Sequence, residues 1–332
     1  MVSQTPTTCS EQKPESPFSR IVSKIVKTRE VTLLVLIFSI VVTMSFVSPY
    51  FFSAGNFRAI AVGMVPTAII VIGMAILLTS GGFDLSVGSV MALSSTVVAM
   101  LLLAGLSIPV AVGLGLVLGA VCGLVNGVLV TKVGINPLVA TLGTMSIARG
   151  AALVLTEGFS VSNLPTEFGI VGKTAVLGIP MLFVLVLVLV VTFDLLVRHT
   201  LFFRQIYFIG ANEKAAMLSG IPVDRVRIIA YVLTGTLAAL AGVLLASRLM
   251  SGTPTAGNAL ELQVLAAAVI GGASLRGGEG TILGAFLGVV FVALINNAMT
   301  MLAVSIYWQV IVTGAVLVSA VALDMLVRRK VA

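Results

Sequence analysis

The sequence predicts an all-α integral membrane protein with about ten transmembrane helices and with its N- and C-termini in the cytoplasm. Of its 332 residues, 59% are hydrophobic and only 9% are charged, which is too little polar surface to cover a water-soluble globule. Long, nearly uncharged stretches such as 31–47 and 114–130 approach the roughly 20 apolar residues that a helix needs to cross a bilayer. A membrane barrel would instead require short segments of alternating apolar and polar residues, which this sequence lacks.

Polar or glycine-rich breaks divide the chain into ten hydrophobic segments, of which the eighth is the shortest. The first follows a polar tail without a small-residue cleavage pattern after it, so we expect an anchor and not a cleaved signal peptide. Residues 1–18 are rich in Ser, Thr, Pro and Gln and are expected to be a disordered cytoplasmic tail, which leaves 19–332 as a single transmembrane domain. The ten segments are 31–50, 58–78, 84–103, 108–131, 137–156, 176–197, 227–247, 260–275, 281–301 and 305–327.

The positive charges fix the expected orientation. With the N-terminus inside, 15 of the 19 Lys and Arg residues fall on the cytoplasmic side, as the positive-inside rule requires. The remaining four are Arg58, Arg149, Lys173 and Arg248. The same bias accounts for the net charge of +7 without any nucleic-acid partner.

Two loops are longer than the rest: an external one over 157–175 and a cytoplasmic one over 198–227. Residues 212–218 of the cytoplasmic loop favour a short helix that ends near Gly220 and Pro222. Such a helix would lie outside the membrane, where a cytoplasmic partner could contact it.

Glycines recur in steps of four in the fourth predicted segment, at Gly115, Gly119, Gly123 and Gly127, and near the ninth, at Gly280, Gly284 and Gly288. This spacing places each set on one helix face and predicts close helix packing without a direct role in transport.

Charged side chains inside the membrane are rare and therefore informative. The candidates are Asp84, Arg149, Glu261 and Arg248. Asp84 follows two glycines in TSGGFDLSVGS, which favours an interrupted helix or a re-entrant turn. Its carboxylate could cap the following helix, and we weigh this structural role above direct contact with a substrate.

Several uncharged polar residues could supply hydrogen bonds along a path for a polyhydroxylated solute. Each of them could equally satisfy a neighbouring helix, which is the commoner use. The group comprises Asn126, Thr141, Thr144, Ser146, Gln263, Asn296, Asn297 and Gln309. As a translocation path or gate we single out Asp84, Ser86, Asn126, Thr144, Asn296 and Asn297.

Enzymatic motifs are absent from the sequence. It contains no G-x-x-x-x-G-K-[ST], H-E-x-x-H or G-x-S-x-G pattern, and its two cysteines, Cys9 and Cys122, suggest neither a disulfide nor a metal cluster. We therefore expect a transport protein without a catalytic site, a cofactor or an ATP site of its own. A stand-alone ion-coupled carrier remains the rival interpretation, since such carriers also use broken helices and buried carboxylates.

Four blocks of the chain, in this order, resemble the ribose, galactose, xylose and autoinducer-2 type permeases of ABC importers, over about residues 35–328. They are TSGGFDLSVGSVMALSS (79–95), NGVLVTKVGINPLVATLGTMSIARGAALVLTEG (126–158), IYFIGANEKAAMLSGIPVDRVRIIAYVLTG (206–235) and VLAAAVIGGASLRGGEGTILGAFLG (264–288).

The resemblance implies a type II-like permease subunit in the bacterial inner membrane. Its implied partners are a second permease copy or paralogue, two cytoplasmic ATP-binding cassette subunits, and a periplasmic or lipid-anchored sugar-binding protein. The implied solute is a ribose-like pentose or a hexose, with autoinducer-2, a polyol or a nucleoside as alternatives. By the same resemblance, the cytoplasmic loop is the segment that couples to the ATPase, through Gly210, Asn212, Ala215, Ala216, Gly220, Ile221 and Arg225.

Overall fold

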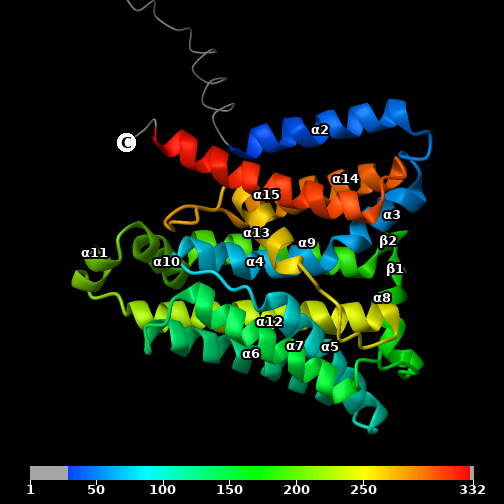
Figure 1. Ribbon diagram of the computed structural model, residues 1–332, viewed down its shortest axis with the longest axis horizontal. Coiled ribbons are helices and arrows are strands. Elements are labelled where there is room, and N and C mark those ends of the chain that lie inside the picture. Colours follow the sequence, from blue (N-terminus) through cyan, green and yellow to red (C-terminus); the bar gives the residue numbers. More distant parts are fainter. Residues whose placement is uncertain (1–28, 330–332) are drawn as a thin grey trace, which may run out of the picture.

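The computed structural model describes residues 29–329, which form a bundle of α-helices joined mostly by short loops (Figure 1). The predicted tail over 1–18 lies outside the described residues. The main helices are α2 (Arg29–Val47), α3 (Ala54–Gly63), α4 (Val65–Thr79), α5 (Val87–Leu103), α6 (Ile108–Thr131), α7 (Pro137–Thr156), α9 (Met181–His199), α12 (Val223–Leu249), α13 (Leu260–Ile270), α14 (Ile282–Met301) and α15 (Ile306–Arg329).

All ten predicted hydrophobic segments contain a helix, but fewer than ten helices could cross a membrane by themselves. Among the described residues, six helices are long and apolar enough to do so, and a seventh span results if α3 and α4, which are bent by 41° at Met64, count together. Helix α13 has only 11 residues, about 16 Å, and cannot cross a hydrocarbon core of about 30 Å.

The two ends of the bundle differ in their elements. Short helices α10 (Leu201–Ala211) and α11 (Glu213–Leu218) project at one end, called here the α11 end, where α2 begins and α15 ends (Figure 1). At the opposite end, called the α8 end, lie the 3-10 helix η1 (Thr166–Phe168), helix α8 (Gly169–Lys173) and strands β1 (Ala175–Val176) and β2 (Ile179–Pro180).

A short antiparallel hairpin at the α8 end corrects the predicted start of one helix, while the fold remains mostly helical. The segment expected to be helical from residue 176 begins its helix only at Met181. Leu177 and Gly178 have positive φ angles of 52° and 83°, which turn the chain so that Ala175 pairs with Pro180. Glycine adopts a positive φ angle without strain, which favours a turn at Gly178. The helix begins only after the strand that follows this turn.

Helix α12 forms the centre of the bundle, where it packs against α4, α5 and α6. The glycine stripe of α6 makes this approach possible. A side chain at Gly119 would collide with the carbonyl oxygen of Gly235 and with Ala239, and one at Gly123 would collide with the carbonyl of Tyr231. The predicted packing role of this stripe is confirmed.

Two elements are interrupted inside the bundle. Helix α4 ends at Thr79 and residues 81–86 run without helical structure to α5, which confirms the interruption predicted from the glycines. Residues 250–259 form a second non-helical segment, which connects α12 to α13. It packs against α5, where Gly257 contacts Gly88. The second glycine stripe then lets α14 pack on α13, with Gly284 against the carbonyl of Gly271.

Candidate functional site

An open cavity of about 240 Å³ lies between α3, α4, α13 and α14, and we call it the polar cavity. Along α14 its wall extends from Val289 to Thr300, a rise of about 16 Å from the middle of the bundle toward the α8 end. Its polar lining residues are Thr67, Gln263, Asn296, Asn297 and Thr300, and its apolar ones are Ala59, Ile60, Gly63, Met64, Val289, Val292 and Ala293.

Three side chains in this wall, Thr67, Gln263 and Asn296, form no hydrogen bond with any described residue. Threonine hydroxyls elsewhere in the helices bond to the carbonyl four residues earlier, as Thr79 and Thr234 do. A polar group left unpaired in an apolar interior is costly, so these groups are ones that water or a solute can satisfy. The polar cavity therefore offers free hydroxyl and amide groups to a ligand.

The other two polar lining residues have partners within the protein: the Thr300 hydroxyl donates to the backbone carbonyl of Asn296, and Asn297 pairs with Asn56. The Asn297 amide donates to the carbonyl oxygen of the Asn56 side chain at 2.7 Å, and the Asn56 amide donates back at 3.2 Å. Asn56 is buried and also donates to the carbonyl of Phe51. This reciprocal pair holds α3 against α14 at the α8 end of the polar cavity.

The other four residues of the predicted path form a separate, closed network. The Asp84 carboxylate accepts hydrogen bonds from the backbone N–H and the hydroxyl of Ser86, at 2.8 and 2.6 Å, and from the amide of Asn126 at 3.1 Å. The hydroxyl of Thr144 donates to the carbonyl oxygen of the Asn126 side chain at 2.6 Å. All four side chains are buried, so the network joins the 81–86 segment to α6 and α7 and stands apart from the polar cavity.

Ser86, and not Asp84, is the N-cap residue of α5. Asp84 accepts the N–H of Ser86, which precedes the helix, so the predicted capping of α5 by Asp84 is not seen.

The remaining intramembrane polar residues bond to the protein backbone. Arg149 donates two hydrogen bonds of 2.7 Å to the carbonyls of Pro254 and Ala256, and so anchors the 250–259 segment to α7. The side chains of Thr141, Ser146 and Gln309 donate to the carbonyls of Pro137, Leu142 and Val304. Glu261 lies in the first turn of α13, beside Gly88.

At the α11 end, the predicted short helix is present as α11 and is capped as the sequence suggests. The side chain of Asn212 accepts the N–H of Ala215 at 3.0 Å, and Gly220 ends the turn with a φ of 80°. Ala216 is buried, whereas Ala215 and Arg225 are exposed.

Two apolar side chains at the same tip were not singled out from the sequence. Leu218 is 91% exposed and Met217 is 50% exposed. Exposed apolar residues on a projecting helix are typical of a protein contact.

The sequence also gave no indication of α10, whose apolar face carries the buried residues Phe203, Ile206 and Ile209. This helix attaches α11 to the bundle. A side chain at Gly210 would collide with the carbonyl of Thr79 and the backbone N–H of Gly278, so the backbones of α10, α4 and the 271–281 loop meet there.

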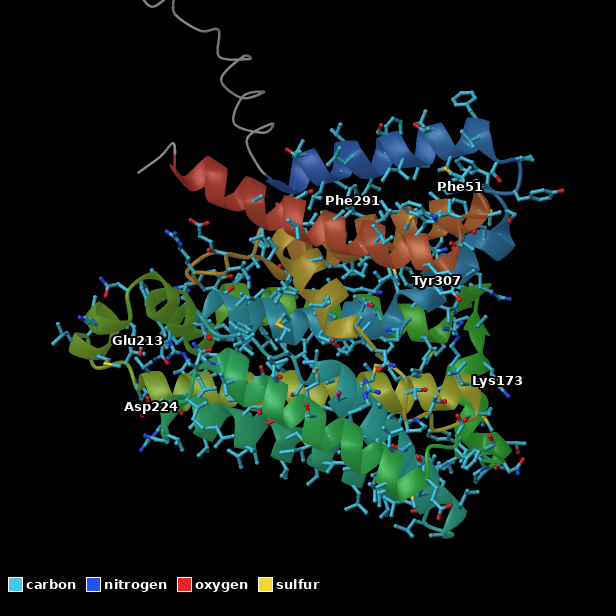
Figure 2. The ribbon with its side chains drawn as sticks, viewed as in Figure 1. Phe51, Lys173, Glu213, Asp224, Phe291 and Tyr307 are labelled. Carbon is cyan, nitrogen blue, oxygen red and sulfur yellow. The ribbon has the colours of Figure 1, made fainter. Side chains whose placement is uncertain are left out.

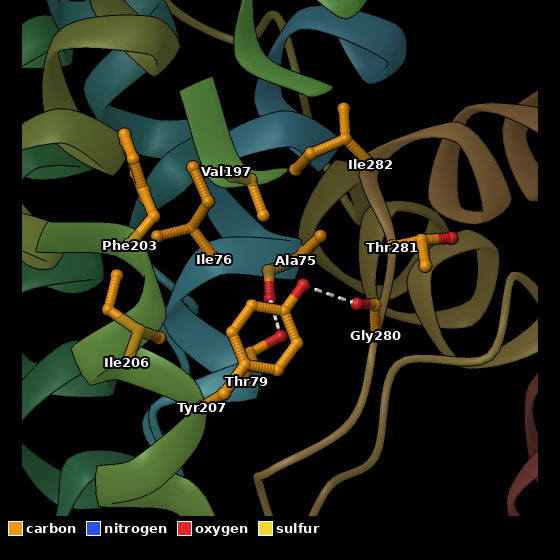
Figure 3. A pocket seen from close by; sticks show the side chains of 10 residues that line it. All are labelled: Ala75, Ile76, Thr79, Val197, Phe203, Ile206, Tyr207, Gly280, Thr281 and Ile282. Atoms are coloured by element: carbon orange, nitrogen blue, oxygen red, sulfur yellow. Dashed lines mark hydrogen bonds between the residues drawn. The ribbon is translucent and has the colours of Figure 1, made fainter. Parts of the chain in front are cut away.

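Two side chains extend this contact to the loop before α14 and to the end of α4. The Tyr207 hydroxyl donates to the carbonyl of Gly280 at 2.7 Å (Figure 3). The small pocket around this bond, lined by residues of α4, α9 and α10, has a volume of only about 10 Å³. Arg227 donates to the carbonyl of Ser80 at 3.1 Å and pairs with Glu213 of α11 at 2.9 Å. A displacement of α10 and α11 would therefore reach the end of α4 and the start of α14 directly.

Interrupted helices, a polar cavity with unpaired groups at one end and an exposed helical projection at the other define a multi-pass membrane protein of the permease class. Residues 56–321 match the family described as the permease component of the branched-chain amino acid transport system, and the chain belongs to this family.

Curated relatives are similar over most of their length. The ribose import permease protein RbsC of Bacillus subtilis is 41% identical over 87% of this chain and 90% of its own. The RbsC protein of Escherichia coli is 39% identical, over 88% and 92% of the two chains, and the L-arabinose transport system permease protein AraH of E. coli is 37% identical over 83% and 84%. No solved structure matches the chain.

Proposed function

We propose that this chain is the permease subunit of a bacterial ATP-driven importer that moves a monosaccharide, a ribose-like pentose or a hexose, across the inner membrane. The α11 end then faces the cytoplasm and the α8 end faces outward. This orientation is supported by the cationic residues of the α11 end. Arg204 lies in α10, Arg225 lies in the first turn of α12, Lys132 pairs with Asp224 of the same turn, and Arg276 lies beside Gly81 after the end of α4.

The single observation that favours a sugar over an amino acid is the chemistry of the polar cavity. None of the twelve described residues that line it is charged, whereas Thr67, Gln263 and Asn296 offer neutral donors and acceptors. A zwitterionic amino acid would leave its two charges unpaired in such a cavity, at a high desolvation cost. A neutral polyhydroxylated solute carries no charge and so avoids this desolvation cost, which agrees with the ribose and arabinose named for the relatives.

Asn296 and Asn297 are the two predicted path residues that line the polar cavity, and we assign them to the outer half of the path. The buried network of Asp84, Ser86, Asn126 and Thr144 is assigned to holding the interrupted element in place. In this proposal the closed network keeps its position while α3, α13 and α14 change the width of the cavity.

The chain depends on partners for energy and delivery. Two cytoplasmic ATPase subunits contact α11 through Ala215 and Leu218 and the first turn of α12 through Arg225. A second permease copy or paralogue completes the path. An external binding protein delivers the sugar at the α8 end. ATP binding displaces α10 and α11, and the displacement biases the bundle between outward and inward access because it differs in energy between the two states.

The test is uptake of radiolabelled ribose, arabinose, xylose and galactose into proteoliposomes that contain the chain, its ATPase and its binding protein. We expect uptake of at least one sugar only with internal ATP and with the binding protein, and no uptake of leucine. Uptake by the chain alone, driven by a proton or sodium gradient, would contradict the proposal.

A further inference from the structure

Three cationic side chains converge on one pocket at the α8 end. Arg58 of α3, Lys173 of α8 and Arg248 of α12 line an open space of about 330 Å³, which we call the cationic pocket. The side chains of Arg58 and Lys173 are exposed, and Lys173 marks this end of the molecule in Figure 2. The rest of the wall is uncharged and includes the small residues Gly55, Ala59, Gly172 and Ala175.

These residues are three of the four Lys and Arg residues that depart from the cytoplasmic charge bias. No ion pair joins any of them to an acidic group within residues 29–329. Arg58 and Arg248 make only long contacts of 3.4 Å, to the carbonyls of Gly178 and Val62. Three like charges gathered without a counter-charge produce a strongly positive potential that attracts an anionic partner.

We propose that the cationic pocket is the docking site for carboxylate side chains of the external binding protein. This inference rests on the proposed function, which requires such a protein to deliver the solute at this end. Two guanidinium groups and one ammonium group suit carboxylates, because an arginine fork pairs with both carboxylate oxygens.

The position of the cationic pocket favours a protein partner that covers the polar cavity. The two spaces share the helix between them: Ala59 lines both, Val62 faces the cationic pocket, and Ile60 and Gly63 face the polar cavity. A protein held at the cationic pocket therefore lies beside the mouth through which its solute must enter.

The pocket is also built before any partner arrives. Gly172 lies against the backbone of Ser247 and Arg248 so closely that a side chain there would collide, and its N–H donates to the Ser247 hydroxyl at 3.1 Å. This contact fixes Lys173 beside Arg248. A preformed site loses little conformational entropy when the partner binds.

Docking at this site has a consequence for the polar cavity. Arg248 contacts the Val62 carbonyl near the end of α3, directly before the 41° bend into α4. A carboxylate that pairs with Arg58 and Arg248 pulls on the middle of α3 and on its C-terminal end, and this helix is one wall of the polar cavity. Docking and cavity opening are thus mechanically linked through one short helix.

The experiment measures the affinity of the importer's own binding protein for the complete permease–ATPase complex in lipid nanodiscs, at about 50 and 300 mM salt. We expect Arg58→Gln and Lys173→Gln each to weaken docking by about three- to tenfold at low salt, because each removes one exposed charge pair. The double variant is expected to show a flatter dependence on salt than the wild type. Lys132→Gln, at the opposite end of the bundle, is the matched control and is expected to leave docking unchanged.

Unchanged affinity and salt dependence in the double variant would overturn the inference. The inference would also be overturned if the double variant docked normally but co-purified with less phosphatidylglycerol than the wild type. In that case the pocket would bind lipid phosphate and not the binding protein. Both substituted residues are exposed, and thermal unfolding and ATPase activity verify that each variant is folded. Wild-type uptake that needs ATP and the binding protein supports the proposed function whichever docking result is obtained, and uptake without the binding protein contradicts that function separately.

Discussion

The hydroxyl of Tyr207 donates a 2.7 Å hydrogen bond to the backbone carbonyl of Gly280 and thereby ties α10 to the loop that leads into α14. Burial holds the pKa of the Tyr207 phenol above its usual range, so the donor proton stays in place throughout the physiological pH range. The bond is one of the direct links between the proposed ATPase contact and the wall of the polar cavity.

Replacing Tyr207 with Phe removes this link and keeps the ring. We expect uptake per ATP hydrolysed to fall by about two- to tenfold, the effect of one hydrogen bond, with ATP hydrolysis itself retained. The measurement is the ratio of sugar transported to phosphate released in proteoliposomes. Tyr307→Phe, which alters an exposed tyrosine at the α8 end, is the control, and equal ratios in both variants would exclude a coupling role for the bond.

The polar cavity makes a second prediction, about substrate interaction. Thr67→Val and Asn296→Leu remove groups that no described residue satisfies, so both variants should fold normally and transport less sugar at low concentration. We expect the apparent KM to rise by about three- to tenfold for each.

Thr236→Val is the matched control for Thr67→Val, because the hydroxyl of Thr236 bonds to the carbonyl of Val232 in its own helix. Its uptake kinetics should equal those of the wild type. A normal KM in Thr67→Val and Asn296→Leu would remove the polar cavity from the transport path.

Much of this architecture could be predicted from local patterns. Hydrophobic runs identify the helices, Asn212 and Gly220 mark the limits of α11, and the glycines before Asp84 indicate the interruption. Each of these signals is contained within a few neighbouring residues. The hairpin before α9 was not predicted because its strands are only two residues long and continue into an apolar helix.

Which residues make up each site was harder to predict from the sequence, because it depends on contacts between residues that are far apart in the chain. The sequence grouped Asn126 with Asn296 because both are amides in apolar helices. Only the packing separates Asn126, bonded to Asp84, from Asn296, which faces the polar cavity. Thr67 and Tyr207 were missed because neither differs locally from residues that merely fill a helix interface.

A third prediction concerns the buried network. Asn126→Leu leaves the carboxylate of Asp84 and the hydroxyl of Thr144 without their amide partner, and an unsatisfied buried group costs about 1–3 kcal/mol. We expect a lower unfolding temperature in detergent, measured by the fluorescence of a thiol-reactive probe or by circular dichroism. Adding Asp84→Leu to Asn126→Leu should cost less than the sum of the two single changes, because the two residues share one interaction. Strict additivity would show that the network does not act as a unit.

The fourth prediction uses two glycines of α6 that differ only in their surroundings. Gly119→Leu should prevent stable assembly of the permease, because a side chain there collides with Gly235 and Ala239 of α12. Gly113→Leu makes the same change two turns away, at a position with nothing within 4 Å, and should be tolerated. The measurement is the yield of monodisperse protein in size-exclusion chromatography. Equal yields for the two variants would contradict the close-packing role of the α6 stripe.

The last prediction concerns the exposed tip of α11. Leu218 is 91% exposed although it is apolar, and Arg225 is exposed on the first turn of α12 close by. In the proposed function both side chains contact the ATPase. Leu218→Asp places a charge in an apolar contact, and Arg225→Glu reverses the charge of its side chain. Each variant should therefore weaken both ATPase binding and uptake by about tenfold or more.

The control for this pair is Arg204→Glu, which reverses an exposed charge on α10 away from the tip. Co-purification of the ATPase with each permease variant measures the contact, and ATP-dependent uptake measures its consequence. Because neither Leu218 nor Arg225 is buried, the variants should insert and fold like the wild type. If both variants retained the ATPase and transported normally, the motor would have to contact a different part of the α11 end, and the link from Tyr207 to Gly280 would lose its proposed input.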